Sequence, residues 1–437
     1  MNGPPPGPAP DARSNGAAGG DADATIDLAR DLTAQREDRY HRLGLIRWWD
    51  QSKLRAANVM VIGAGALGNE LLKHLALLGV GHVLVCDFDE IEPSNLSRTI
   101  LFRPGDEGAS KARVAATRVR EINPDVKIAC LHGDVGNDVG LGVFRRMDVV
   151  LGGVDNVEAR IAVNGACWRA GTPYVDGGTH SFEGQVRVFA APDGPCYECV
   201  LTPEQYKRMS ERVRCNLLTE MDPSMVEGKV ATTPIASSII AALEVHQAIN
   251  LLHGMEPLRG KTIVFNGPTA ETYVAGYQPR DTEHHVHSEM PAPLEVMELP
   301  AAHSHMTVRA FLDLLRAKLG HDVTVHFGRN VVRALTCGPC DRRTDVLLPL
   351  TRLRGKHLAC PTCGAEREYE MFHTLDAGEV DESRTLRECG IPLLEVLFAY
   401  DGENGVYVEL TGDLEELGAF DGEIRPPPWH TGEMAAS

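Results

Sequence analysis

The chain is poor in aromatic residues and in uninterrupted apolar runs. Phe, Trp and Tyr make up 5% of its 437 residues, and no apolar run approaches the roughly 20 residues that a membrane-spanning helix needs. Positive charge is in deficit, with 43 Lys and Arg against 61 Asp and Glu and a formal net charge of −18. Because such a field repels phosphate backbones and anionic lipids, we expect neither nucleic acid nor a membrane as a partner.

The N-terminus lacks the pattern of a signal peptide. Residues 1–24 (MNGPPPGPAPDARSNGAAGGDADA) contain no apolar core, which favours a cytoplasmic protein. Eleven cysteines are present, and six of them form three C-x-x-C pairs. In a reducing compartment such pairs indicate zinc rather than disulfides.

Composition divides the chain into four parts. Residues 1–34 are rich in Pro, Gly, Ala and Asp and are predicted to be a disordered tail. Residues 35–290 form a large α/β domain in this prediction, and residues 291–424 form a smaller C-terminal α+β region. Residues 425–437 are predicted to be a flexible tail.

Strand and helix patterns alternate through the large domain. This alternation predicts a Rossmann-like, doubly wound parallel sheet with helices on both faces. The expected strands are 58–63, 82–89, 126–134, 147–153 and 184–190, and the expected helices are 69–80, 110–123, 157–171 and 234–254.

A glycine-rich loop follows the first expected strand. Gly63, Gly65 and Gly68 allow a tight turn and a close approach of the backbone to phosphate, and the helix that follows offers its N-terminal N–H groups. Asp87 lies nineteen residues past Gly68, at the end of the next strand, where it suits a ribose. These residues alone fit a dinucleotide and a mononucleotide equally well.

The residues after Asp87 favour ATP. Asn95 and Arg98 lie in the next loop and Lys111 opens the next helix. A triphosphate with a leaving pyrophosphate needs such cations more than a dinucleotide does. Asp155 follows a further strand, at the edge where open sheets bind ligands, and a carboxylate there can hold Mg²⁺.

Together these motifs resemble the ThiF/MoeB/HesA superfamily, the adenylating domain shared with ubiquitin-activating enzymes. The matching pieces stand in the family's order: RYHRLGLI, GAGALG, CDFDEIEPSNLSR, GGVDNVEAR, PYVDGGTHSFEGQV and CYEC. The resemblance implies that Asp87 binds the ribose, that Asn95, Arg98 and Lys111 contact phosphates, and that Asp155 acts near Mg²⁺ and the reacting carboxylate.

Two further positions are interpreted through the resemblance. Arg42 matches an arginine that reaches the partner subunit's ATP, which implies a homodimer. Ala66 occupies the third small position of the family's glycine loop, a mild change that leaves the backbone cradle intact.

One cysteine outside the C-x-x-C pairs is a candidate nucleophile. Cys215 lies in a polar segment with Arg212 and Arg214 beside it, and positive neighbours favour the reactive thiolate. Thioester-forming members of the superfamily carry their cysteine in this stretch. The resemblance therefore implies a thioester at Cys215, although members that only adenylate dispense with this cysteine.

The C-x-x-C pairs predict two structural zinc sites. CGPC and CPTC form a zinc ribbon with four thiolate ligands, Cys337, Cys340, Cys360 and Cys363. The family supplies a second C-x-x-C after the long helix, and TEHHVH stands there in this chain. That implies a site of two cysteines and two histidines, Cys196, Cys199, His284 and His287, with His285 as a spare ligand.

The sequence as a whole favours an ATP- and Mg²⁺-dependent enzyme. The expected reaction is adenylation of the C-terminal glycine of a ubiquitin-like protein, followed by transfer to Cys215. A sulfur-carrier adenylyltransferase of the molybdopterin or thiamine type and a non-enzymatic, zinc-stabilised scaffold remain as alternatives. The C-terminal region is interpreted as a platform for the carrier or a conjugating enzyme.

Overall fold

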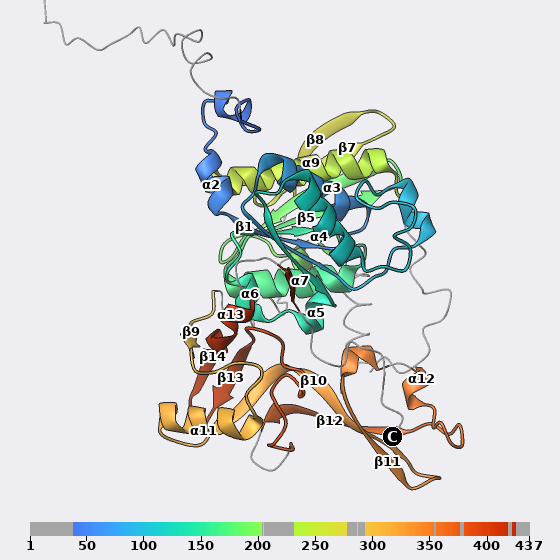
Figure 1. Ribbon diagram of the computed structural model, residues 1–437, viewed down its shortest axis with the longest axis vertical. Coiled ribbons are helices and arrows are strands. Elements are labelled where there is room, and N and C mark those ends of the chain that lie inside the picture. The colour runs from blue at the N-terminus through green and yellow to red at the C-terminus, as the bar shows by residue number, and fades with distance from the viewer. Residues whose placement is uncertain are drawn as a thin grey trace, which may run out of the picture.

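A nine-stranded sheet forms the centre of the larger part of the protein (Figure 1). The computed structural model describes residues 38–202, 204, 231–277, 286, 293–353, 355–375, 380–417 and 422–424. The strand order is β15-β3-β2-β1-β4-β5-β6-β7-β8. The bounds are β1 Asn58–Ile62, β2 His82–Asp87, β3 Lys127–His132, β4 Val149–Gly152, β5 Tyr174–His180, β6 Glu183–Phe189, β7 Lys261–Asn266, β8 Glu271–Gly276 and β15 Gly422–Ile424.

Parallel pairing dominates this sheet, as the sequence predicts. Strands β15, β3, β2, β1, β4 and β5 are parallel, and β6, β7 and β8 add antiparallel pairs at one side. The chain moves outward in one direction from β1 to β2 and β3, and then returns to β4 on the other side of β1. In open α/β sheets, ligands bind at the carboxyl ends of the strands where this reversal occurs.

Helices cover both faces of the sheet. Helices α3 (Ala66–Leu78), α4 (Lys111–Ile122) and α9 (Pro234–Leu252) pack on one face and share a core with β1 and β2. Helices α5 (Val135–Asp138), α6 (Leu141–Phe144) and α7 (Val157–Ala170) pack on the other. The fold class predicted from the sequence is confirmed as a mixed α/β structure with a parallel sheet.

Local sequence sets the ends of these helices. Asn156 caps α7 by accepting a hydrogen bond from the backbone N–H of Ala159, and Gly171 ends the helix with a φ of 74°. Thr233 caps α9 in the same way, ahead of Pro234 in the first turn.

Helix α9 is long and apolar enough, by length and composition, to cross a membrane. Half of its most apolar window is buried, and it packs against α3, β5 and β6. Its buried side chains include Ile240, Ala241 and Val245. Helix α9 is therefore a core helix of this fold.

A second sheet lies in the part of the chain after residue 293. Its order is β11-β10-β13-β14-β9, and β12 pairs with β10. Helix α11 (Val308–Leu319) packs on it through Val308, Phe311 and Leu315. The bounds are β9 Val296–Glu298, β10 Thr324–Cys337, β11 Arg342–Pro349, β12 Glu368–Leu375, β13 Val396–Tyr400 and β14 Gly405–Glu409.

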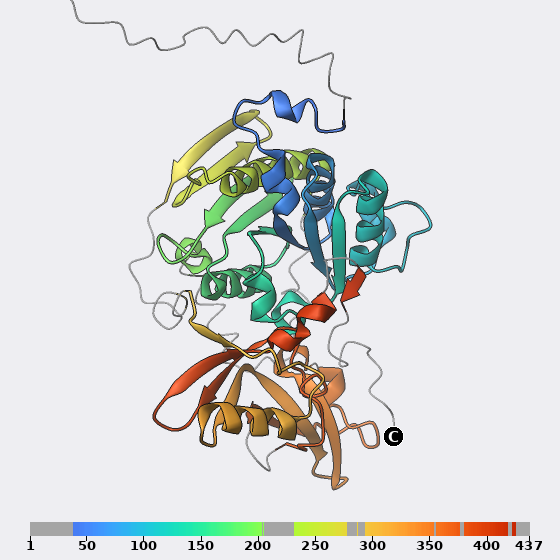
Figure 2. The ribbon, with the colours of Figure 1, turned by 60° about the vertical axis from the view of Figure 1, so that its left-hand side comes forward.

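We call residues 38–277 the N-terminal module and residues 293–417 the C-terminal module. The two modules share one apolar core, in which Leu393 and Leu394 of the C-terminal module pack with Leu141 and Phe144 of α6. Residues 422–424, grouped with the C-terminal region from the sequence, add the strand β15 beside β3 of the N-terminal sheet (Figure 2). The chain thus returns to its first sheet after it has formed the second.

Candidate functional site

The glycine loop lies where the strand order reverses, between β1 and β4. Gly63 has a φ of +90°, and a Cβ there would lie 2.6 Å from the carbonyl oxygen of Gly153. A Cβ on Gly68 would lie 1.8 Å from the carbonyl oxygen of Gly63. Neither position can carry a side chain, so the glycines keep the two strand ends and α3 in close contact.

Helix α3 begins immediately after Gly65. A Cβ on Gly65 would meet no atom within 4 Å. Unlike Gly63 and Gly68, Gly65 is therefore not needed for close packing of the protein, and its missing side chain leaves open space in front of the helix. Ala66 is the first residue of α3. The N-terminus of this thirteen-residue helix offers unpaired N–H groups and a positive dipole end, which suit a phosphate.

Asn69 braces the loop, a role that sequence analysis did not assign. Its side chain is fully buried, donates to the carbonyl oxygens of Ala64 at 2.7 Å and Gly65 at 3.1 Å, and accepts from the backbone N–H of Leu101 at 2.9 Å. A polar residue on the apolar face of the helix after a glycine loop is the signal that could have identified it.

Asp87 ends β2 beside the glycine loop. Its carboxylate accepts hydrogen bonds from the backbone N–H groups of Ala64 at 2.6 Å and Asp89 at 2.7 Å. Burial raises the pKa of Asp87 to about 6, although Lys111 and these two hydrogen bonds act in the opposite direction. The carboxylate is thus fixed at the carboxyl edge of the sheet, where a ribose can be bound.

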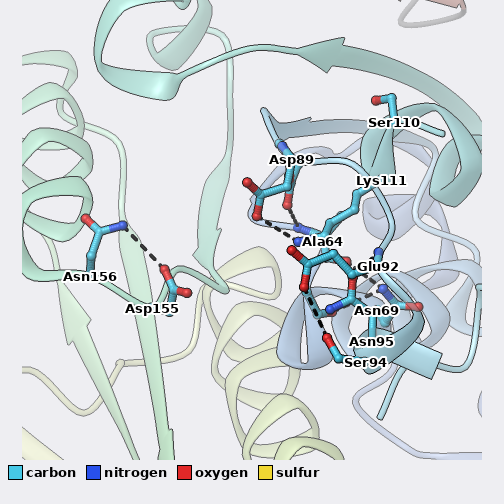
Figure 3. A network of polar contacts seen from close by, with 12 residues as sticks. Ala64, Asn69, Asp89, Glu92, Ser94, Asn95, Ser110, Lys111, Asp155 and Asn156 are labelled. Atoms are coloured by element: carbon cyan, nitrogen blue, oxygen red, sulfur yellow. Dashed lines mark hydrogen bonds and ion pairs between the residues drawn. The ribbon is translucent and has the colours of Figure 1, made fainter. Parts of the chain in front are cut away.

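Lys111 is a nearly buried cation at the start of α4. Its ammonium lies 2.7 Å from a carboxylate oxygen of Asp89, and its backbone N–H donates to the carbonyl oxygen of Asp89 at 3.0 Å. Figure 3 shows this pair next to the Ala64 end of the glycine loop. Asp89 was not singled out in the sequence, although it lies two residues after Asp87 in the motif.

Asn95 and Arg98 lie in the short helix η2 (Pro93–Ser97) and at its end. Asn95 is buried and accepts a hydrogen bond from the backbone N–H of Glu92 at 2.9 Å. The guanidinium of Arg98 donates to the carbonyl oxygen of Ser94 at 2.6 Å. Figure 3 shows the Glu92–Asn95 turn on the same side of the site as Lys111, away from Asp155.

Asp155 lies on the loop that follows β4. It is exposed, and the side chain of Asn156 donates to its carboxylate at 3.4 Å. Figure 3 shows these two residues on a separate loop from the group around Lys111. An exposed carboxylate at this edge of the sheet is a suitable ligand for Mg²⁺.

The other predicted catalytic residues lie elsewhere. Arg42 is exposed, next to the short helix η1 (Leu43–Leu45), on the N-terminal arm that stands above the sheet in Figure 1. Cys215 lies outside the described residues, as do His284 and His287.

Four cysteines of the C-terminal module form a compact cluster. The sulfur atoms of Cys337, Cys340, Cys360 and Cys363 all lie within 4.8 Å of one another, and those of Cys337 and Cys363 are 3.6 Å apart. Tetrahedral zinc with Zn–S bonds of about 2.3 Å would hold its sulfurs about 3.8 Å apart. Backbone N–H groups of Cys363 and Thr362 lower the pKa of Cys360 to about 6, which favours the thiolate. The cluster fits a zinc site.

Cys196 and Cys199 form a second pair, with sulfur atoms 3.9 Å apart. Both are buried and pack with Trp168 and with Val286. The hydrogen bond with Cys199, together with burial, raises the pKa of the Cys196 thiol well above its usual range. Val286 stands between His285 and His287 in the sequence, and both histidines lie outside the described residues.

Fold and site together define an α/β protein whose glycine loop, at the reversal point of its parallel sheet, suits a nucleotide phosphate. The ThiF family profile matches residues 38–286, more than half of the chain. The chain therefore belongs to the ThiF family, which confirms the resemblance found in the sequence.

Two curated relatives support the same assignment, and one solved structure is reported with them for its similarity alone. A sulfur carrier protein adenylyltransferase of Thermus thermophilus is 38% identical over 176 residues, covering 38% of this chain and 65% of that protein. A SAMP-activating enzyme E1 of Haloferax volcanii is 39% identical over 176 residues, covering 40% and 64%. Among solved structures, E. coli MccB with ATP has a TM-score of 0.44 at 22% identity, covering 55% of this chain and 72% of that one. The chain spans less than two thirds of the length of these curated relatives.

Proposed function

We propose that this protein is an ATP-dependent adenylyltransferase that activates the C-terminal glycine of a ubiquitin-like or sulfur-carrier protein. An oxygen of that carboxylate attacks the α-phosphorus of ATP, the bond to the β-phosphate oxygen breaks, and pyrophosphate leaves. The product is an acyl-adenylate. Membership of the ThiF family and the activities named for the relatives support this reaction class.

The position of Lys111 carries the proposal. Its nearly buried ammonium lies beside the glycine loop and Asp87. There it would stabilise a bound polyphosphate, because it balances the negative charge that develops on the leaving pyrophosphate. Asp89 keeps the Lys111 side chain ordered until ATP arrives. Arg98 and Asn95 are proposed to contact the phosphates, and Asp87 the ribose.

Mg²⁺ belongs to the proposal as a partner of the phosphates, with Asp155 as its protein ligand. The carboxylate is exposed and free to turn towards a bound triphosphate. When bound, Mg²⁺ would neutralise phosphate charge.

A thioester at Cys215 is the proposed second step. The thiolate would attack the acyl carbon, and AMP would leave with the oxygen that joined the phosphate to the acyl group. Without this step the protein would be a sulfur-carrier adenylyltransferase, the activity named for the Thermus relative. A conjugating enzyme would be a further partner only if the thioester forms.

We also propose a homodimer, in which Arg42 reaches the partner's nucleotide. The arm that carries Arg42 exposes 53% of Leu45 and 48% of Trp48, and a second copy would cover this apolar surface. A cytoplasmic location is proposed as well, since none of the ten described cysteines forms a disulfide.

The proposed activity is tested by incubating the protein with ATP, Mg²⁺ and candidate ubiquitin-like or sulfur-carrier proteins. Exchange of labelled pyrophosphate into ATP is the expected result, and Lys111→Ala should lower it by about 10²- to 10³-fold. Lys318→Ala, at an exposed position of α11, is the matched control and should leave the exchange rate unchanged. Absence of exchange with every carrier would overturn the enzyme proposal.

Non-reducing gels of the same reactions test the second step. A carrier adduct that thiols cleave and that Cys215→Ala abolishes supports the thioester. Pyrophosphate exchange without an adduct identifies a protein that only adenylates.

A further inference from the structure

A short turn after β3 is bonded directly to the strand that carries Asp87. We call residues 133–138 the β3 turn. The backbone N–H of Gly133 donates to the carbonyl oxygen of Asp87 at 3.2 Å, and the thiol of Cys86 donates to the carbonyl oxygen of Gly133 at 3.2 Å. These two hydrogen bonds connect the turn to the end of β2.

Asp138 holds the turn closed from within. Its carboxylate accepts a hydrogen bond from the backbone N–H of Asp134 at 2.6 Å, while the Asp134 carboxylate accepts from the N–H of Gly136 at 2.7 Å. The Asp138 side chain is fully buried. A buried carboxylate needs a cation or several donors, and a cation comes from the other module.

Two arginines of the C-terminal module contact this turn. Arg352, in the short helix η5 (Leu350–Arg352), lies 2.5 Å from the same Asp138 oxygen. Arg329, in β10, donates to the carbonyl oxygen of Asn137 at 2.6 Å and pairs with Glu395. Glu395 in turn accepts from the backbone N–H of Leu141, at the start of α6, at 3.2 Å.

Several negative charges lie around the turn. Asp134 and Asp138 both act on the Cys86 thiol, whose pKa is raised first by burial and then by these carboxylates and Asp87. Removal of the Arg352 guanidinium would take away one positive partner of the buried Asp138 carboxylate. The negative charge of Asp138 would then be less balanced, close to the end of β2 that carries Asp87. Such a charge would favour opening of the turn and would repel a polyphosphate.

We infer that Arg352 and Arg329 are positioning residues for the nucleotide site, through which the C-terminal module holds the β3 turn and the end of β2 in the shape that binds ATP. The inference rests on the proposed function, since it assigns these residues to the same site. They need not touch the nucleotide. They act through Asp138 and Asn137.

Isothermal titration of the full-length chain with a non-hydrolysable ATP analogue and Mg²⁺ tests the inference. Arg352→Met should raise the Kd about tenfold or more, and Arg352→Lys, which keeps the charge, should restore most of the affinity. Arg329→Met breaks the second contact and should weaken binding in the same direction. It also provides an independent measurement if Arg352→Met does not fold.

Glu409→Gln is the matched control. Glu409 joins the two modules through Arg145 and Arg146, at the end of α6 rather than at the turn. This change should lower the Tm but leave the Kd within about twofold of wild type. If Arg352 had only a structural role, Arg352→Met and Glu409→Gln would show the same rise in Kd for the same loss of Tm.

The outcomes separate the two proposals. If wild type binds the analogue and both Arg352→Met and Arg329→Met bind it equally well, this inference is wrong while the proposed function stands. If both variants lose no more affinity than Glu409→Gln at equal loss of Tm, the inference is also wrong. A wild-type chain that binds no analogue overturns the proposed function and the inference together.

Discussion

Asp87 combines a buried position with the need for a negative charge. Its carboxylate is 9% exposed and relies on Lys111 and two backbone N–H groups for its ionised form. Because its pKa in the folded protein, about 6, lies above the ordinary 3.8, the folded chain holds the proton more tightly than the unfolded chain. The stability that this residue contributes therefore falls as pH rises from about 4 to about 6.

Nucleotide binding should show the opposite dependence on pH. At pH 5 about one Asp87 in ten would be ionised, so the Kd for the ATP analogue should be up to about tenfold higher than at pH 7. Asp87→Asn should bind weakly with a flatter profile, and it corrects for titration of the nucleotide itself. Identical slopes for the two proteins would rule out Asp87 as the group responsible.

Two alanine substitutions in the glycine loop distinguish glycines needed for backbone packing from glycines needed for ligand binding. Gly68→Ala places a methyl group 1.8 Å from the Gly63 carbonyl oxygen, so unfolding should be easier by about 1–3 kcal/mol and nucleotide affinity should fall. Gly65→Ala has open space and should keep its Tm while losing affinity. Denaturant unfolding and titration distinguish the two. Unchanged affinity in Gly65→Ala would argue against phosphate at α3.

Secondary-structure elements were largely predictable where their sequence pattern was local. The strand ends, the glycine loop and the caps of α7 and α9 follow from short motifs, which carry their own physical reasons. The role of Asn69 could not be deduced in this way, because its partner Leu101 lies 32 residues away. The contact between Arg352 and Asp138 could not be deduced either, because Asp138 lies 214 positions earlier in the chain.

The zinc ribbon should act as a structural centre of the C-terminal module. It lies where β10 ends and β11 begins, since Cys337 is the last residue of β10 and pairs with Arg342. Metal analysis should find about two zinc ions per chain, and Cys360→Ser should remove one of them and lower the Tm. Changing both Cys196 and Cys199 to Ser should remove the other. A value near one in wild type would exclude the site with His284 and His287.

At the scale of the whole molecule, buried ion pairs join the two modules. The Glu409 carboxylate is fully buried and pairs with Arg145 and Arg146 of the other module. Removing one partner of a buried pair is strongly destabilising. Interface stability should therefore depend on this residue more than on surface pairs.

Glu409→Ala should lower the free energy of unfolding by about 3–5 kcal/mol. Arg343→Ala, which removes a partner of exposed Glu370 and Asp345, should change it by about 1 kcal/mol or less. Urea unfolding measures both. Equal effects of the two changes would show that the interface pairs behave like surface pairs.

The strand β15 has a consequence for how the chain is made. Its three residues close the edge of the first sheet beside β3, yet they are synthesised almost 300 residues after β3. During translation the β3 edge therefore stays uncovered while the rest of that sheet can already form, and an open edge invites pairing with other chains. Ribosome-bound intermediates of this protein should depend on chaperones until β15 has been synthesised, and a bulky fusion placed directly after Ile424 should interfere with the pairing of β15 with β3.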